Sequence, residues 1–313
     1  MLSALLPRFK RSDIRGRAEM ISEPTTNEPT MSESTMIEPP MSKPTNDIYD
    51  NLVLIKGAGD LATGVAHRLF RAGIPVMMTE ISRPTVVRRT VAFAEAVFDG
   101  SAQVERVTAN LIQKPEDRTK VLEAGEIPLL VDPELNCLET VRPQILVEAT
   151  LAKKNTGISK DDAPIVIALG PGYIAGQDVD AVVETKRGHY LGRVVYQGRA
   201  LPNTGVPGEV AGYTRERVLY SPGTGMIENF ARIGDKVEAG EQVALVEGQP
   251  IRAQVSGVLR GMIRQGLKVK QGMKVGDVDP RADVEHCWTI SDKARSVAGG
   301  VLEASLALSR SKI

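Results

Sequence analysis

A glycine-bearing bend between an apolar segment and a helix-like segment constrains the fold of this chain most strongly. The apolar residues 52–55 run into Gly57-x-Gly59-x-x-Ala62, and a helix-like run follows. The first glycine permits a tight turn, the second lets a pyrophosphate approach the backbone, and the alanine lets the helix pack against the strand. The candidate cofactor-binding residues of this bend are Gly57, Gly59, Asp60, Ala62 and Gly64.

A second apolar segment supports the same interpretation. Residues 75–79 read as a strand that ends at Glu80, 23 residues after Gly57. An acidic side chain at this place can hold a ribose hydroxyl of a bound nucleotide. The alternative is a Rossmann-like βαβ unit whose loop is empty or serves another purpose. The bend therefore predicts a nucleotide-type ligand without excluding a purely structural unit.

Composition and charge exclude several classes of protein. The chain has 39 basic and 39 acidic residues, so no overall field favours nucleic acid or a membrane surface. No stretch of about 18 uninterrupted apolar residues occurs, which argues against a membrane-spanning helix. Two cysteines, Cys137 and Cys287, form neither a disulfide framework nor a paired metal motif. We therefore expect a reducing, cytoplasmic setting.

The first two thirds of the chain divide into three parts. Residues 1–46 contain five imperfect proline-bearing pentads at 21–45 and are expected to be a disordered tail. Residues 47–175 alternate near-continuous aliphatic runs with mixed segments, as do parallel strands that helices bury on both faces. This part is expected to be a Rossmann-like domain. Residues 176–215 are rich in glycine and arginine and are expected to form a β extension or linker.

An internal repeat marks a second domain over residues 216–280. Residues 232–246 align with residues 264–278 at an offset of 32, and each copy predicts turn, short strand, glycine turn and short strand. The pattern resembles a biotinyl/lipoyl-like (sandwiched hybrid) β barrel. No lysine occupies the hairpin between the halves, so neither biotin nor lipoate is expected. Residues 281–313 are expected to form a C-terminal helix that packs on the body.

The densest cluster of reactive side chains lies in residues 184–193. Arg187 and Arg193 have the geometry to clamp a phosphate or a carboxylate, and His189 has the chemistry to donate or shuttle a proton. An exposed turn with solvated charges explains the same residues equally well. A metal site is not expected, because no second histidine or cysteine stands at ligand spacing from His189.

Two further segments carry candidate site residues. Asp277 and Asp279 lie two positions apart before Arg281, and on an extended segment both carboxylates point to one side. This spacing suits a cation or the fixing of arginines, whereas the alternative is a strand that ends in an Asp-Pro turn. Gly170 and Gly172 form a corner after an aliphatic strand, where ligands bind in open α/β sheets or where the chain simply turns.

Six segments of the chain carry a resemblance when they are taken together and in order: residues 56–64, 170–173, 184–193, 203–205, 257–264 and 274–281. Together they resemble the YqeB-like family, accessory proteins of selenium-dependent molybdenum hydroxylases. The resemblance covers about residues 50–305. The resemblance implies a maturation role and marks Arg187, His189, Arg193, Asp277, Asp279 and Arg281 as site residues without assigning their chemistry.

Two functions from different classes follow. The first is an accessory or maturation factor that binds a nucleotide or molybdopterin-type cofactor, together with a molybdenum hydroxylase apoenzyme or related accessory proteins. The absence of a recognisable triad or strong acid–base pair fits this hypothesis. The second is an NAD(P)-dependent oxidoreductase that uses the Gly57–Gly64 loop, with His189 or Tyr173 in proton transfer. Neither the oligomeric state nor the enzyme class is predicted by the sequence.

Overall fold

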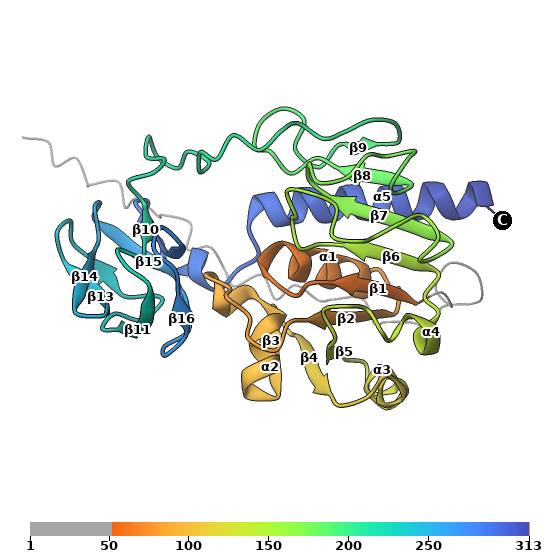
Figure 1. Cartoon of the computed structure of the whole chain (residues 1–313), viewed down its shortest axis with the longest axis horizontal. Helices are drawn as coiled ribbons and strands as arrows, with labels where there is room; N and C mark the ends of the chain where they lie inside the picture. Colours follow the sequence, from red (N-terminus) through yellow and green to blue (C-terminus); the bar gives the residue numbers. More distant parts are fainter. Residues whose placement is uncertain (1–51, 313) are drawn as a thin grey trace, which may run out of the picture. The chain divides into compact units, whose positions relative to one another are not determined.

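The largest element of the fold is a nine-stranded sheet (Figure 1). The computed structural model describes residues 52–312, so the predicted tail over 1–46 lies outside the described residues. The strand order is β3-β4-β5-β2-β1-β6-β7-β8-β9. The strands are β1 (Val53–Lys56), β2 (Val76–Glu80), β3 (Ser101–Val104), β4 (Val107–Ile112), β5 (Ile127–Val131), β6 (Ile145–Glu148), β7 (Ile165–Leu169), β8 (Ala181–Val183) and β9 (Val194–Val195).

The sheet is mixed rather than parallel. Strands β4, β5, β2, β1, β6, β7 and β8 run parallel to their neighbours, whereas β3 pairs antiparallel with β4 and β9 pairs antiparallel with β8. Strand β1 lies in the middle, and its residues alternate between two apolar cores: Val53 and Ile55 face one, Leu54 the other. Burial on both faces explains the near-continuous aliphatic runs in these strands.

The two faces of the large sheet are covered in different ways. Helices α1 (Asp60–Arg71) and α5 (Asp292–Lys312) pack on one face and contact each other. On the other face, loop residues such as Ile158 and Tyr173 supply most of the apolar cover. The remaining helices are short: α2 (Ala96–Asp99), α3 (Arg118–Glu123), α4 (Leu138–Val141), and the 3₁₀ turns η1 (Arg89–Val91), η2 (Phe93–Glu95), η3 (Pro115–Asp117) and η4 (Val284–Cys287).

Residues 218–279 form two four-stranded antiparallel sheets around a separate apolar core. The first has the order β10-β17-β15-β12, and the second β14-β13-β11-β16. Their strands are β10 (Val218–Tyr220), β11 (Gly225–Asn229), β12 (Lys236–Val237), β13 (Gln242–Val246), β14 (Gln249–Arg252), β15 (Gly257–Met262), β16 (Lys268–Val269) and β17 (Lys274–Asp279). The internal repeat is visible in the backbone, because Gly234 and Gly266, and likewise Gly240 and Gly272, have positive φ at equivalent turns.

The predicted fold, a Rossmann-like parallel domain followed by a biotinyl/lipoyl-like barrel, was wrong, although the C-terminal helix of that prediction is present as α5. The large sheet carries an antiparallel strand at each edge, and the connections from β6 to β7 and from β7 to β8 contain no helix. Residues 218–279 form two open sheets, and no ladder within the described range closes them into a barrel. Aliphatic runs show that strands are buried on both faces, but they do not show whether helices or loops do the burying.

Helix α5 reaches the large sheet because glycines allow its backbone to come close. It begins next to Ser291, whose hydroxyl accepts a hydrogen bond from the N–H of Ala294 at 3.2 Å. A Cβ atom added at Gly300 would lie 2.2 Å from the carbonyl oxygen of Gly192 and 2.8 Å from Val183. The neighbouring Gly299 has no heavy atom within 4 Å of the same added Cβ. One glycine of this pair is thus required by packing and the other is not.

This difference gives a matched test of the α5 contact. Gly300→Ala should lower the free energy of unfolding by about 1–3 kcal/mol, because the added methyl overlaps the backbone of residue 192. Gly299→Ala should raise it by about 0.5–1 kcal/mol, since alanine is the better helix former and meets no neighbour. Urea unfolding of the full chain measures both values. Equal effects of the two substitutions would contradict the packing described here.

Candidate functional site

A cavity of about 820 Å³ opens at the carboxyl ends of parallel strands of the large sheet. Its lining residues after these strands are Asp60 and Leu61 (after β1), Leu151 and Lys153 (after β6), Pro171 (after β7) and Thr185–Gly188 (after β8). The small sheets add Arg217, Arg260 and Lys274, and the start of α5 adds Lys293. Segments far apart in the sequence therefore build one site.

The lining is strongly cationic. Eight basic side chains face the cavity, compared with the two carboxylates of Asp60 and Glu209. The basic residues are Arg88, Lys153, Lys186, Arg187, Arg217, Arg260, Lys274 and Lys293. We call this cavity the cationic cleft. Clefts lined by one sign of charge concentrate ligands of the opposite sign, so an anion is the expected guest.

The arginines and the lysines of the cationic cleft differ in their partners. Each arginine is held by a carboxylate: Arg88 by Asp60, Arg187 by Asp292, and Arg217 and Arg260 by Asp277. The four lysines, in contrast, take part in no ion pair within residues 52–312. The arginines are therefore fixed in place, whereas carboxylates act on Lys274 and Lys293 only from a distance, without a direct ion pair.

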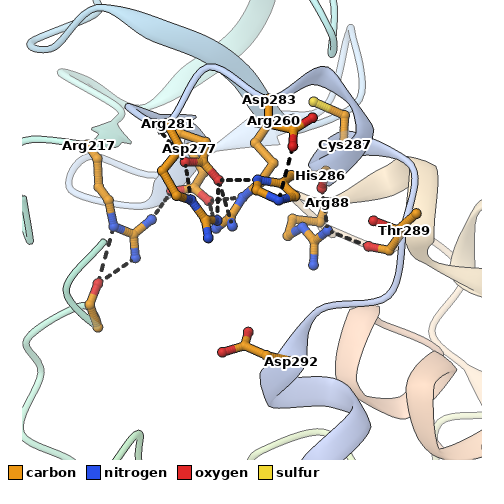
Figure 2. A network of polar contacts seen from close by, with 12 residues as sticks. Arg88, Arg217, Arg260, Asp277, Arg281, Asp283, His286, Cys287, Thr289 and Asp292 are labelled. Carbon is orange, nitrogen blue, oxygen red and sulfur yellow. Dashed lines mark hydrogen bonds and ion pairs between the residues drawn. The ribbon is translucent and has the colours of Figure 1, made fainter. Parts of the chain in front are cut away.

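Asp277 is the centre of the buried part of this network (Figure 2). Its strand β17 lies between β10 and β15, so Arg217, just before β10, and Arg260, on β15, reach the same carboxylate from two sides. Arg260 donates from Nε to Oδ2 at 3.0 Å. Burial opposes ionisation of Asp277, but the charges of Lys274, Arg260 and Arg217 outweigh burial and lower the pKa of this carboxyl.

Asp279 extends the network by one more step. Arg260 donates to it from Nη1 at 3.2 Å, and Arg281 donates from Nε at 2.9 Å and from its backbone N–H at 3.1 Å. Burial acts to raise the pKa of Asp279, yet the hydrogen bonds from Arg281 and the charge of Arg260 lower it to about 2. Neither Asp279 nor Arg281 lines the cleft. Asp279 holds Arg260, and Arg281 in turn holds Asp279.

Lys274 and Lys293 carry charge that the surrounding protein disfavours. Burial within the protein lowers the pKa of Lys293, and the charge of Arg187 adds to this effect. Lys274 is partly exposed, but loss of hydration around its ammonium group lowers its pKa. The charges of Arg217 and Arg260 contribute in the same direction. An anion bound beside these lysines would favour their charged form and offset the effect of burial.

The glycine bend contributes to the cleft less directly than the sequence predicted. Gly57 adopts a φ of +98°, as its tight turn requires. The carboxylate of Glu80 accepts hydrogen bonds from the backbone N–H groups of Ala58 and Ile81, both at 2.8 Å. Glu80 therefore fixes the bend, and it is not among the residues that line the cleft.

The other residues of the bend have separate tasks. A Cβ atom on Gly59 would have only Val86 within 4 Å, at 3.8 Å, so this position leaves room for an approaching ligand. A Cβ atom on Gly64 would lie 2.8 Å from the Cβ of Ala294, so Gly64 serves the packing of α1 against α5. Ala62 is buried in the core. Asp60 reaches the cleft.

The predicted corner at residues 170–173 brings two loops together. Gly170 has a φ of +83°, and a Cβ atom on Gly172 would lie 2.3 Å from the carbonyl oxygen of Ala152. Only Pro171 of this corner lines the cleft. The two glycines thus hold the loops after β6 and β7 against each other. Tyr173 is fully buried, and its hydroxyl lies 2.9 Å from that of Thr156.

The predicted cluster over residues 184–193 is only partly in the cleft. Lys186 and Arg187 line it, whereas His189 and Arg193 are exposed and lie outside its lining. The Arg193 guanidinium lies 5.4 Å from the centroid of the Tyr190 ring. The loop itself is fixed by Glu184, which accepts hydrogen bonds from the backbone N–H groups of Lys186 and Leu201, both at 2.7 Å.

Sequence reasoning missed most of the cationic residues that the fold gathers. Arg88, Arg217, Arg260, Lys274 and Lys293 were not candidates, although all line the cleft. One signal was available for Arg260, which stands inside the apolar strand Gly257–Met262. A buried arginine requires a carboxylate partner, and Asp277 and Asp279 were the nearest pair of that kind in the sequence.

Two absences concern the described residues alone. No group of three or more His, Cys, Asp or Glu side chains within residues 52–312 is arranged to hold a metal ion. Among the helices in that range, none combines the length and the apolar character needed to cross a bilayer.

The sheets and the cleft define a mixed α/β protein with a cationic cleft at the carboxyl ends of its parallel strands. The chain is 47% identical over 266 residues to the uncharacterized protein YqeB of Escherichia coli (strain K12). The aligned part is 85% of this chain and 49% of that protein, so the chain spans about half the length of this curated relative. As the sequence predicted, the chain belongs to the YqeB-like family. No family model matches the chain.

Several solved structures show a distant similarity. One is the ectoine utilization protein EutE (DoeB) from Ruegeria pomeroyi, which is 13% identical. The match covers 73% of this chain and 84% of that chain, with a TM-score of 0.23. An aspartoacylase family protein from Mesorhizobium loti has 14% identity, 72% and 84% coverage, and a TM-score of 0.24. A succinylglutamate desuccinylase from Silicibacter has 13% identity, 73% and 84% coverage, and a TM-score of 0.22. Scores this low carry no argument about activity.

The ion network predicts how stability depends on pH. The pKa of Asp279 is lowered to about 2 in the folded protein, so its contribution is fully present at neutral pH and is lost as the pH falls through that value. Asp279→Asn should therefore lower the free energy of unfolding by about 2–3 kcal/mol at pH 7, and this loss should shrink by roughly half at pH 3. Urea unfolding at both pH values measures the loss.

A control separates this effect from a general sensitivity to acid. Asp161→Asn removes an exposed carboxylate that makes no ion pair within residues 52–312, so it is expected to change stability little at either pH. A loss in Asp279→Asn that stays constant between pH 7 and pH 3 would contradict the assignment of Asp279 as an ionised partner of two arginines.

Proposed function

We propose that the protein binds a phosphate-bearing nucleotide or molybdopterin-type cofactor in the cationic cleft, and that it acts as an accessory factor in the maturation of molybdenum hydroxylases. The observation that carries the binding proposal is the contrast between four arginines fixed by carboxylates and four lysines without an ion-pair partner within residues 52–312. Fixed guanidinium groups recognise phosphate geometry, and lysines without a direct ion pair supply further positive charge.

The size of the cleft supports a ligand larger than inorganic phosphate. Its volume of about 820 Å³ lies within the range of small-molecule and cofactor sites. Apolar side chains such as Leu61, Val86 and Leu151 line it beside the charged groups, so part of the wall suits an uncharged portion of a ligand. A phosphate joined to an organic ring system fits both kinds of lining.

The second part of the proposal rests on the YqeB-like resemblance, since the cleft itself indicates only what is bound. The competing function is an NAD(P)-dependent oxidoreductase. Its expected proton donors do not reach the cleft, because His189 lies outside the lining and Tyr173 is fully buried. The lining contains no histidine, cysteine or tyrosine within the described residues. This arrangement favours binding of the cofactor over its chemical conversion.

Substitution of single lysines tests the binding site. Lys293→Gln and Lys153→Gln should each weaken binding of pyrophosphate and of nucleoside diphosphates about tenfold, because each removes a charged donor from the lining. Isothermal titration calorimetry at low ionic strength measures the affinity. Lys154→Gln is the matched control: this exposed residue follows Lys153 but lies outside the lining, so its affinity should be unchanged.

The calorimetry also separates the competing functions. Loss of affinity in Lys154→Gln equal to that in Lys153→Gln would indicate general electrostatic attraction instead of a site. Tight binding of NAD(H) or NADP(H) with hydride transfer would favour the oxidoreductase and contradict the accessory role.

The accessory role requires a test in cells. Cells that lack this protein should show low molybdenum hydroxylase activity, with cofactor-deficient hydroxylase, and the wild-type gene should restore it. The Lys153→Gln, Lys293→Gln double variant should restore little, whereas Lys154→Gln should restore activity fully. Full hydroxylase activity without the protein would overturn the maturation role and leave the binding proposal intact.

A further inference from the structure

Asp60 is a carboxylate in a place that attracts anions. It is the first residue of α1 and lines the cationic cleft, and its side chain is one-quarter exposed. Its charge acts on Lys274 and Lys293 as well as on Arg88. A carboxylate here repels every phosphate that enters, so its presence calls for a separate reason.

The ion pair with Arg88 does not by itself explain why a carboxylate occupies position 60. Arg88 donates from Nη1 to Asp60 at 3.2 Å, but its Nη2 also donates to the backbone carbonyl oxygens of His286 and Thr289, each at 3.0 Å. The two carbonyl groups already fix the guanidinium. The Oδ1 atom of Asp60 accepts no hydrogen bond from residues 52–312. One oxygen of Asp60 is thus available to a ligand.

Asp60 is the carboxylate through which the glycine bend reaches the cationic cleft. Glu80, the carboxylate that the sequence assigned to a ribose, is used by the backbone N–H groups of Ala58 and Ile81. Asp60 follows Gly59, where an added Cβ atom would meet only Val86. The backbone is therefore open to a ligand beside the free oxygen of Asp60.

We infer that Asp60 selects ligands that carry a hydroxyl or amino donor beside their phosphates, an inference that rests on the proposed binding of a phosphate-bearing ligand. A hydrogen bond to a carboxylate is stronger than one between neutral groups, and it offsets the repulsion only for a ligand that has the donor. Two chemical sources supply such a donor. One is a ribose hydroxyl, and the other is the 2-amino-4-oxopyrimidine edge that guanine and pterin rings share.

The test compares pyrophosphate, ADP and GDP by calorimetry on wild type, Asp60→Asn and Asp292→Asn. Asp292 is a matched control because it also begins a helix and also pairs with a cleft arginine, but it is outside the lining. Asp60→Asn should tighten pyrophosphate binding, since a repulsive charge is gone, and should lower the affinity for the nucleotide relative to pyrophosphate about tenfold. Asp292→Asn should leave that ratio unchanged.

The pattern across nucleotides identifies the donor. A fall in the ratio for both ADP and GDP supports a ribose hydroxyl, and a fall for GDP alone supports the ring edge. If Asp60→Asn leaves the affinity for ADP and for GDP relative to pyrophosphate unchanged, the inference is overturned. Binding of pyrophosphate by wild type would in that case still support the proposed function. Failure of wild type to bind any of the three would overturn both. If Asp60→Asn does not fold, the test uses wild type with IDP, which lacks the 2-amino group of GDP, and with 2′-deoxy-ADP, which lacks a ribose hydroxyl of ADP. If IDP binds as tightly as GDP and 2′-deoxy-ADP binds as tightly as ADP, the inference is again overturned.

Discussion

The buried ion pairs of Asp277 with Arg217 and Arg260 are the interaction on which the cleft depends. The carboxylate is 1% exposed and lies on the strand between the two that place the arginines. Removing it would leave Arg217 without its carboxylate partner and Arg260 with Asp279 alone, in a poorly solvated place, and breaking buried pairs of this kind costs several kcal/mol. The small sheets therefore do more than form a second core, because they fix guanidinium groups at the wall of a site built mostly by the large sheet.

In the proposed binding of an anion, the arginines and the lysines of the cationic cleft would have different roles. Arg187 and Arg260 are already oriented by carboxylates, so little side-chain entropy would be lost when they engage a ligand. Burial lowers the pKa of both Lys274 and Lys293, and the charges of nearby arginines act in the same direction. An anion that binds beside these lysines would favour their charged form.

The sequence predicted local features better than their assembly. The glycine bend, the strand ends and the Asp277–Asp279 pair were visible because each depends on neighbouring residues. Arg217 and Arg88 were invisible as site residues, since their places depend on pairing between distant strands. The fold prediction failed for a related reason: buried aliphatic runs identify core strands such as β6 and β7, but loops join these two where helices were expected. His189 and Arg193 share a motif with Arg187, yet the turn at Gly188 and Gly192 directs them away from the cleft.

Helix α5 has a consequence for how the chain is made. It is the last helix in the described chain, yet it covers α1, the first, and brings Lys293 to the cleft. During synthesis on the ribosome, more than 200 residues must follow α1 before α5, which covers the apolar side of α1, has been made. Sequence-distant contacts of this kind slow folding. The core beside α1 therefore stays incomplete until residues 292–312 have left the exit tunnel, and the cationic cleft gains Lys293 only at that stage.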